Sequence, residues 1–154
     1  MRLKDKVAII TGSGRGLGGE AAILFAQEGA RVVVCDINEQ AAVDTVKAIS
    51  DAGGTAASVR VDVTDADSVR AMADHAMEKF GRIDILVNNA GITADAMLVK
   101  MTDDQWDRVI NVNLKGVFNC TRAVAPIMAR PTCRPRSTAG RATMTGWMER
   151  TDWS

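Results

Sequence analysis

The chain has 154 residues, of which 47% are hydrophobic and 25% are charged, and its formal net charge at pH 7 is zero. A zero net charge gives no electrostatic footprint for nucleic acid, and no apolar run reaches the length of a membrane span. Residues 1–6 lack the apolar stretch of a signal peptide, and the three cysteines show no metal-ligand spacing. We therefore expect a reduced, cytoplasmic globular protein without a metal, nucleic-acid or membrane partner.

A glycine-rich loop joins two apolar runs near the start of the chain. The first run leads into the pattern Gly12-x-x-x-Gly16-x-Gly18, an amphipathic segment follows, and the second run ends on Asp36. Glycine lets the backbone approach a ligand, a helix N-terminus favours a pyrophosphate, and a strand-end carboxylate can accept the hydroxyls of an adenine ribose. This order within one βαβ unit predicts a dinucleotide site; a glycine-rich turn without a ligand is the alternative.

The rest of the chain alternates helical and strand patterns. Helices are predicted at residues 38–51, 64–80 and from 102 onward, and short apolar strands at 57–61 and 84–87. Strands that alternate with helices indicate an α/β fold with helices on both faces of the sheet. Right-handed crossovers then predict a Rossmann-type, doubly wound parallel sheet with strand order 3-2-1-4.

The apolar face of each element predicts the core. We expect these side chains to point inward: Val7, Ile9, Leu24, Val33, Val61, Met72, Phe80 and Leu86. From residue 102 onward we expect one continuous apolar stripe with Asn113 inside it: Trp106, Val109, Ile110, Leu114, Val117, Phe118, Thr121, Val124 and Ala125. A buried amide at Asn113 must find partners, and neighbouring backbone is the simplest. Gly116 in the same helix suggests the close approach of another backbone.

Two motifs give the chain a family resemblance. The TGxxxGxG pattern at residues 11–18 and the NNAG tetrapeptide at 88–91 resemble motifs of the short-chain dehydrogenase/reductase family. Residues 92–98 and 113–116 are similar in particular to its β-ketoacyl-acyl carrier protein reductases, and the resemblance ends near Met128. It implies an incomplete dinucleotide-binding domain at residues 1–128. It also implies an NAD(P)-dependent homo-oligomeric oxidoreductase that moves hydride to or from a small-molecule carbonyl or acyl-carrier substrate.

The resemblance also assigns site residues. It makes Asn113 the Asn of the family's catalytic tetrad, which holds a water in the proton path. The residues that would bind the cofactor are Gly12, Ser13, Arg15, Gly16, Leu17, Gly18, Asp36, Ile37, Asp62, Val63, Asn89, Ala90, Gly91 and Val112. Without the resemblance, the strand-end residues could be ordinary turn formers. NAD(H) is preferred to NADP(H), because Asp36 would repel a 2′-phosphate, although Arg15 could attract one.

The composition changes after Met128. Residues 129–154 hold five arginines and two acidic residues but no Val, Ile or Leu. The family would continue with a catalytic Ser and a Tyr-x-x-x-Lys helix, but the chain contains no tyrosine. We expect this basic tail to be disordered or loosely packed and to form no strand beside residues 85–87. Two interpretations stay open: an oxidoreductase by descent whose chain is interrupted, or a truncated or frameshifted, catalytically inactive nucleotide-binding fragment.

Overall fold

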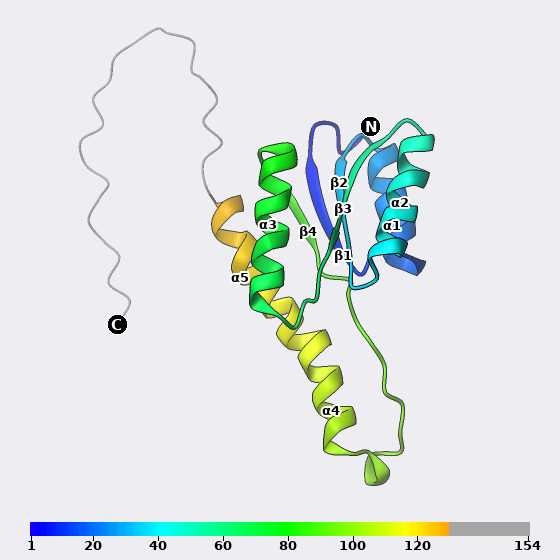
Figure 1. Cartoon of the computed structure of the whole chain (residues 1–154), viewed down its shortest axis with the longest axis vertical. Coiled ribbons are helices and arrows are strands. Elements are labelled where there is room, and N and C mark those ends of the chain that lie inside the picture. Colours follow the sequence, from blue (N-terminus) through cyan, green and yellow to red (C-terminus); the bar gives the residue numbers. More distant parts are fainter. Residues whose placement is uncertain (130–154) are drawn as a thin grey trace, which may run out of the picture.

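The computed structural model describes residues 1–129, so the predictions for residues 130–154 lie outside the described part of the chain. Strands and helices alternate through the first part of the described residues, and a helical segment closes it (Figure 1). The elements are β1 (Val7–Thr11), α1 (Gly16–Gln27), β2 (Arg31–Asp36), α2 (Glu39–Asp51), β3 (Thr55–Arg60), α3 (Ala66–Phe80), β4 (Ile85–Val87), the 3₁₀ helix η1 (Leu98–Lys100), α4 (Asp103–Ile110), the π-helical turn η2 (Asn111–Lys115) and α5 (Gly116–Met128).

The four strands form one parallel sheet in the order β3-β2-β1-β4, which confirms the predicted topology. β1 lies inside the sheet between β2 and β4, and each of its residues is buried. β3 begins at Thr55, two residues before its predicted start, and Val61 follows its last residue. Because all four strands run in the same direction, the loops that follow them gather at one edge of the sheet.

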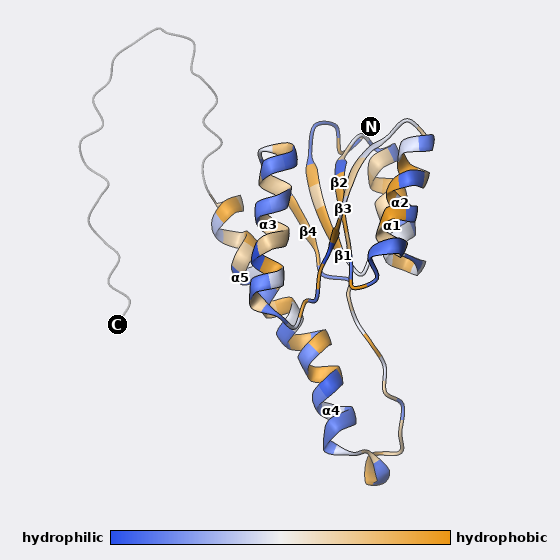
Figure 2. Cartoon of the chain, in the orientation of Figure 1, coloured by the Kyte–Doolittle hydropathy of each residue, from blue (hydrophilic) through white to orange (hydrophobic). Residues whose placement is uncertain are grey.

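Helices cover both faces of the sheet: α1 and α2 lie on one face, α3 and α5 on the other (Figure 1). Ile9 and Val33 pack on the α3 and α5 side, whereas Ile10, Val32 and Val34 pack on the α1 and α2 side. Figure 2 shows hydrophobic residues along the strands and mixed surfaces on the helices. Burial on both faces explains why the strands are almost wholly apolar instead of alternating with polar residues.

The predicted core is confirmed at most of its positions. Val7, Ile9, Val33, Val61 and Met72 are all buried. Two further predicted core residues, Leu86 and Phe80, are partly buried and pack against the cluster that contains Ile9, Val33, Val61 and Met72.

The residues of α1 that are fully buried are all small. Its buried residues are Gly18, Gly19, Ala22 and Ala26. Leu24 is 52% exposed, and Leu17 is exposed as well, so the prediction that Leu24 belongs to the core is wrong. Small side chains let α1 lie close to its neighbours. Ile23 and Phe25 are partly buried against the core, whereas Leu17 and Leu24 lie on the outer face.

The helical segment after β4 is interrupted by the π-helical turn η2. A π-helical turn bonds residue i to i+5 and so shifts the faces of everything that follows it, relative to an uninterrupted α-helix. The buried residues of α5 are accordingly Gly116, Asn119, Cys120 and Val124. Leu114 and Phe118 are 63% and 55% exposed, and Thr121 and Ala125 are exposed as well, so the prediction of one continuous buried stripe is wrong at these positions.

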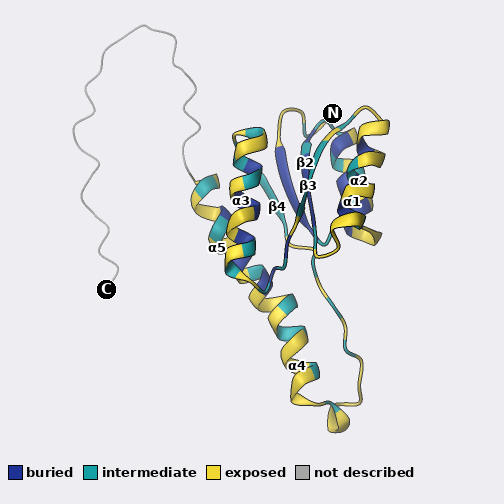
Figure 3. Ribbon diagram, in the orientation of Figure 1, coloured by how far each residue is buried: buried dark blue, intermediate teal, exposed yellow. Residues whose placement is uncertain are grey.

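α4 has no buried residue, and Trp106 is exposed, because this helix extends away from the sheet (Figure 3). The stripe predicted for α4 therefore has no surface to pack against within the described residues. No helix among residues 1–129 is both long enough and apolar enough to span a membrane.

Candidate functional site

A cleft of about 340 Å³ opens where the four strands end. Its volume is within the rough range of about 300–1,000 Å³ that is typical of small-molecule sites. Ten of the predicted cofactor residues line it: Gly12, Arg15, Asp36, Ile37, Asp62, Val63, Asn89, Ala90, Gly91 and Val112. Four other lining residues were not predicted as cofactor residues, namely Thr11, Cys35, Val61 and Ile92. Cys35 and Val61 are apolar or weakly polar strand-end residues without a motif signal, whereas Thr11 and Ile92 belong to the motif stretches at residues 11–18 and 92–98.

Thr11 and Asn89 bind the glycine loop to the segment after β4. Thr11 Oγ1 accepts hydrogen bonds from the backbone amides of Asn89 and Ala90, both at 3.1 Å. Asn89 Nδ2 donates to the carbonyl oxygens of Thr11 at 3.0 Å and Gly12 at 2.9 Å. Asn89 therefore shapes the cleft by holding the loop in place.

The glycine loop at residues 11–18 and the NNAG segment at residues 88–91 also lie so close together that no side chain fits between them. Gly12 has a φ of +63°, and a Cβ there would lie 2.8 Å from Ala90 Cα. A Cβ on Gly18 would lie 2.5 Å from Asn89 Nδ2. The two glycines thus serve contact between the motifs, which explains why Gly18 is buried and does not line the cleft.

Ser13 is buried beneath the loop and does not line the cleft. Its hydroxyl donates to the carbonyl of Ile10 at 2.6 Å and accepts from the amide of Cys35 at 3.1 Å. The side chain of Ser13 therefore joins β1 to β2. The backbone amide of Ser13 also donates to the carbonyl of Cys35 at 3.0 Å, and the predicted contact of Ser13 with a cofactor stays a prediction.

Asp36 ends β2 and faces the glycine loop. Its Oδ2 accepts from the amide of Gly14 and its Oδ1 from the amide of Asn38, each at 2.9 Å. Each carboxylate oxygen has two lone pairs, so both can still accept a ligand hydroxyl. The structure thus places Asp36 in the cleft with an orientation fixed by two backbone amides.

The N-terminus of α1 lacks a side-chain cap, unlike those of α2, α3 and α4. Arg15 occupies the N-cap position and makes no capping bond, whereas Asn38, Asp65 and Thr102 each accept one from their own helices. The first turn of α1 also contains no acidic residue. Its free amide donors and positive dipole end suit a pyrophosphate, and they lie beside the cleft that Arg15 lines. Gly16 and Leu17, which do not line the cleft, are exposed on this turn.

Asp62 and Val63 form the part of the cleft that follows β3. Asp62 Oδ1 accepts from the amide and the hydroxyl of Thr64, at 2.9 and 2.7 Å. Asn119 of α5 is buried, and its Nδ2 donates to the carbonyl of Val63 at 3.0 Å. Asn119 was not predicted to support the site, although its amide side chain stands within the otherwise apolar stretch at residues 116–120.

Cys35 lies on the floor of the cleft and is buried. Burial raises the pKa of its thiol far above the usual range, and nearby Cys120 and Asp36 add to this effect. The thiol is therefore neutral and acts as an apolar lining group. Burial also raises the pKa of Cys120 to about 11.

Asn113 lies in η2 and is exposed, which contradicts its predicted burial. Its Oδ1 accepts from the amide of Ile92 at 2.9 Å, and its Nδ2 donates to the carbonyl of Ile92 at 3.0 Å. The interpretation that neighbouring backbone satisfies this amide is thus confirmed. Asn113 does not line the cleft, but it holds Ile92, which does. π-Helical turns occur frequently at functional sites, and this one contains both Asn113 and the cleft residue Val112.

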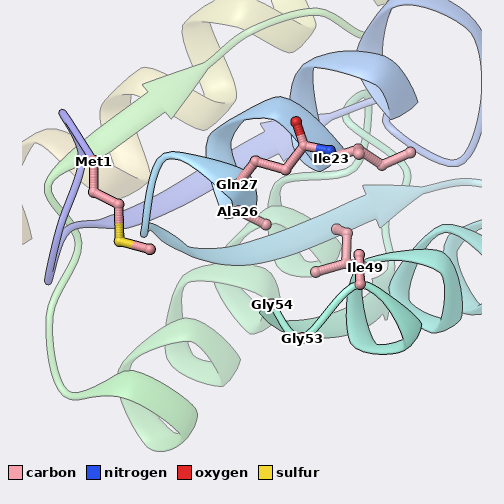
Figure 4. Close-up of a pocket in the computed structure, with 8 residues that line it drawn as sticks. Met1, Ile23, Ala26, Gln27, Ile49, Gly53 and Gly54 are labelled. Atoms are coloured by element: carbon pink, nitrogen blue, oxygen red, sulfur yellow. The ribbon is translucent and has the colours of Figure 1, made fainter.

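A smaller cavity of about 100 Å³ lies away from this edge (Figure 4). Its lining residues are Met1, Ile23, Ala26, Gln27, Ile49, Ala52, Gly53 and Gly54. They come from the N-terminus, the C-terminal half of α1 and the end of α2 with the loop after it, at the opposite edge of the sheet from the strand ends. No predicted site residue lines this cavity, and it is too small for a nucleotide.

The chain belongs to the short chain dehydrogenase family, whose profile matches residues 6–142. This match continues beyond Met128, where the resemblance was predicted to end. The chain is 48% identical over 130 residues to 3-oxoacyl-[acyl-carrier-protein] reductase FabG of Thermotoga maritima, and the alignment covers 84% of this chain and 53% of that protein. The predicted resemblance to this class of reductase is therefore confirmed.

Two solved structures show the same relationship. A hydroxysteroid dehydrogenase from Escherichia coli is 44% identical with a TM-score of 0.79, covering 82% of this chain and 54% of that one. A short chain dehydrogenase/reductase from Burkholderia phymatum in complex with NAD is 39% identical with a TM-score of 0.79, covering 83% of this chain and 46% of that one. The chain thus spans about half the length of the relatives that it matches.

Proposed function

We propose that the chain binds a nicotinamide dinucleotide in the strand-end cleft and forms the nucleotide-binding half of an oxidoreductase. The observation that carries this proposal is the uncapped N-terminus of α1 beside a cleft that also contains the carboxylate of Asp36. Amide donors suit a pyrophosphate, and a strand-end carboxylate suits ribose hydroxyls. The NAD complex of the related Burkholderia phymatum protein supports the same choice of ligand.

The residues of the chain bind and orient the ligand. The first turn of α1 holds the pyrophosphate, Asp36 accepts from the ribose, and Asp62 and Val63 lie beside the base. The dinucleotide, when bound, supplies or takes up the hydride. Asn113 orients the segment at Ile92 and holds a water in the proton path.

The proposed substrate is a small-molecule carbonyl compound or an acyl-carrier thioester. Support comes from the 3-oxoacyl-[acyl-carrier-protein] reductase of Thermotoga maritima, at 48% identity. The family resemblance further favours a homo-oligomer. We place the protein in the cytoplasm, because Cys35 and Cys120 are free thiols, as is usual in a reducing compartment.

A second candidate function is dinucleotide binding without catalysis. The observation that favours it is the absence of tyrosine from all 154 residues, because the family uses a tyrosine to exchange the substrate proton. An assay of NADH oxidation with a β-ketoacyl thioester separates the two functions. Turnover by the purified chain would contradict the binding-only function, and sequencing the coding DNA past residue 128 would show whether another frame encodes the Tyr-x-x-x-Lys motif.

Calorimetric titration with NADH and NADPH tests the choice of cofactor. Two like charges about 4 Å apart cost roughly 4 kcal/mol at an effective dielectric constant near 20, and exposure and salt reduce that cost. We therefore expect NADH to bind about tenfold or more tightly than NADPH. Asp36→Ala should reduce the ratio of NADPH to NADH dissociation constants. Asp74→Ala, which removes an equal charge from an exposed position of α3, should leave this ratio unchanged.

Tighter binding of NADPH than NADH by the wild-type chain would contradict the predicted preference for NAD(H). Failure to bind either dinucleotide would contradict the proposed function itself.

A further inference from the structure

Thr45 carries a buried hydroxyl between α2 and the glycine loop. It is 8% exposed, and its Oγ1 donates to the carbonyl oxygen of Gly14 at 3.0 Å. A threonine inside a helix often donates to a carbonyl one turn back in its own helix, but Thr45 bonds a residue 31 positions earlier. Gly19 of α1 lies beside it, since a Cβ there would be 3.7 Å from Thr45 Oγ1. The hydroxyl thus links α2 to the loop from which α1 begins.

Gly14 also holds the carboxylate of Asp36. Its amide donates to Asp36 Oδ2 at 2.9 Å, so the carbonyl of Gly14 is held by Thr45 and its amide by Asp36. No side chain fits at this position: a Cβ would lie 2.8 Å from Ala41 Cβ and 2.9 Å from Asp36 Oδ2. Gly14 is therefore buried between α2 and the end of β2, with both of its backbone groups bonded to side chains.

Loss of the Thr45 hydroxyl would leave the Gly14 carbonyl buried without a donor. Such a group costs free energy, so the loop would shift until the carbonyl found water. That shift would loosen the bond from the Gly14 amide to Asp36, and the carboxylate could then turn within the cleft. Asp36 is the group to which we assign the exclusion of a 2′-phosphate.

We propose that Thr45 is a positioning residue for cofactor choice. It holds Gly14 so that Asp36 keeps the orientation that favours NADH over NADPH. Thr45 does not touch the dinucleotide and acts only through the backbone of Gly14. The inference rests on the proposed dinucleotide function and extends it to a residue outside the cleft lining.

Thr45→Val tests the proposal, because valine has nearly the shape of threonine but no hydroxyl. Thr45→Ser keeps the hydroxyl and is the matched control. We expect Thr45→Val to lower the ratio of NADPH to NADH dissociation constants by about fivefold or more, the factor that corresponds to one ordinary hydrogen bond. Thr45→Ser should keep a ratio close to that of the wild-type chain. A variant that weakens both cofactors equally, or that lowers only the melting temperature, would show a purely structural role and overturn the proposal.

Amide hydrogen exchange without cofactor provides a measurement that does not depend on binding. The Gly14 amide should exchange faster in Thr45→Val than in the wild-type chain and Thr45→Ser, relative to the buried Ile9 amide, which reports overall stability. Unchanged exchange at Gly14 would overturn the proposal. If the wild-type chain binds neither dinucleotide, the proposed function fails, yet exchange still decides whether Thr45 holds Gly14. Thr45→Ala serves the same test if Thr45→Val does not fold.

Discussion

Asp84 shows how one side chain fixes the start of two strands. Its Oδ2 accepts from the amide of Val7 at 2.9 Å and from Arg82 Nε at 2.8 Å, and Lys6 Nζ lies 3.7 Å from Oδ1. Burial acts to raise the pKa of Asp84, but the hydrogen bonds from Arg82 and Val7 and the charges of Arg82 and Lys6 outweigh it. The pKa therefore lies below its usual value.

Asp84→Asn should destabilise the chain by about 1–3 kcal/mol at pH 7, because it removes a charged acceptor from a partly buried site. A carboxyl group whose pKa is lower in the folded than in the unfolded state stabilises the fold. This stabilisation is complete at pH values above the unfolded-state pKa and is lost as the pH falls through the folded-state pKa. The difference in unfolding free energy between wild type and variant should thus be constant at neutral pH and shrink below about pH 4.

Urea denaturation across this pH range measures the difference. Asp74→Asn, at an exposed position of α3, is the control and should change the unfolding free energy little at any pH. A difference for Asp84→Asn that stays the same down to pH 3 would contradict the assigned role of the carboxylate.

At the scale of the element, the turn η2 determines which side of α5 faces the sheet. It leads Gly116 onto Val63, where a Cβ on Gly116 would lie 2.7 Å from Val63 Cγ2 and 3.1 Å from Val63 Cβ. The predicted approach of another backbone at Gly116 is wrong, because the close atoms belong to the side chain of Val63 and the nearest backbone atom, Val63 O, would lie 3.7 Å away. This contact and the bond from Asn119 hold α5 against the residues that follow β3.

Gly116→Ala should therefore destabilise the chain, against the trend of helix propensity. Alanine would gain about 1 kcal/mol in an open helix position. Overpacking against the stiff, buried Val63 costs roughly 1–3 kcal/mol, so the net change should be unfavourable. Denaturant unfolding measures the sign, and Lys115→Ala, at the exposed neighbouring position, is the control. In a Val63→Ala background the cost of Gly116→Ala should shrink; a stabilising Gly116→Ala in the wild-type background would contradict the contact.

At the scale of the whole molecule, the described sheet has two inner strands, β1 and β2, and two edge strands, β3 and β4. β1 pairs with β2 and β4, whereas β4 pairs with β1 alone among residues 1–129. All residues of β1 are buried, but those of β4 are only partly buried. An inner strand such as β1 is therefore more fully buried than the edge strand β4.

Truncation of one side chain in each strand tests this difference. Ile9→Ala should cost roughly 2–5 kcal/mol, because Ile9 is buried in the strand that has neighbours on both sides. Leu86→Ala should cost clearly less, because its partly exposed side chain buries less apolar area. Both variants are measured by urea denaturation, and equal costs would mean that β4 is more enclosed than the described residues show.

The sequence by itself determined the sheet order and the edge that carries the cleft. Apolar runs, helical spacing and glycines are local patterns, and right-handed crossovers leave few ways to connect them. Asp36 ends one strand and Asn89 follows another. Both could be predicted to lie at the cleft, because parallel strands end at the same edge of the sheet. The same local logic predicted that backbone would satisfy Asn113, since an amide side chain requires partners wherever it lies.

Only the tertiary structure decided which faces are buried and which polar residues support the cleft. The buried residues of α1 are glycines and alanines, which do not stand out when a helix face is predicted from the spacing of large apolar residues. Leu24 was therefore predicted to be buried, although it is exposed. The π-helical turn η2 changed which residues of α5 face the sheet. Such a turn depends on contacts with other segments, which the sequence of the helix alone does not reveal. Thr45, Ser13 and Asn119 are ordinary polar residues in the sequence; each gains its role from a backbone group on another segment. Folding alone brings those donors and acceptors within hydrogen-bond distance.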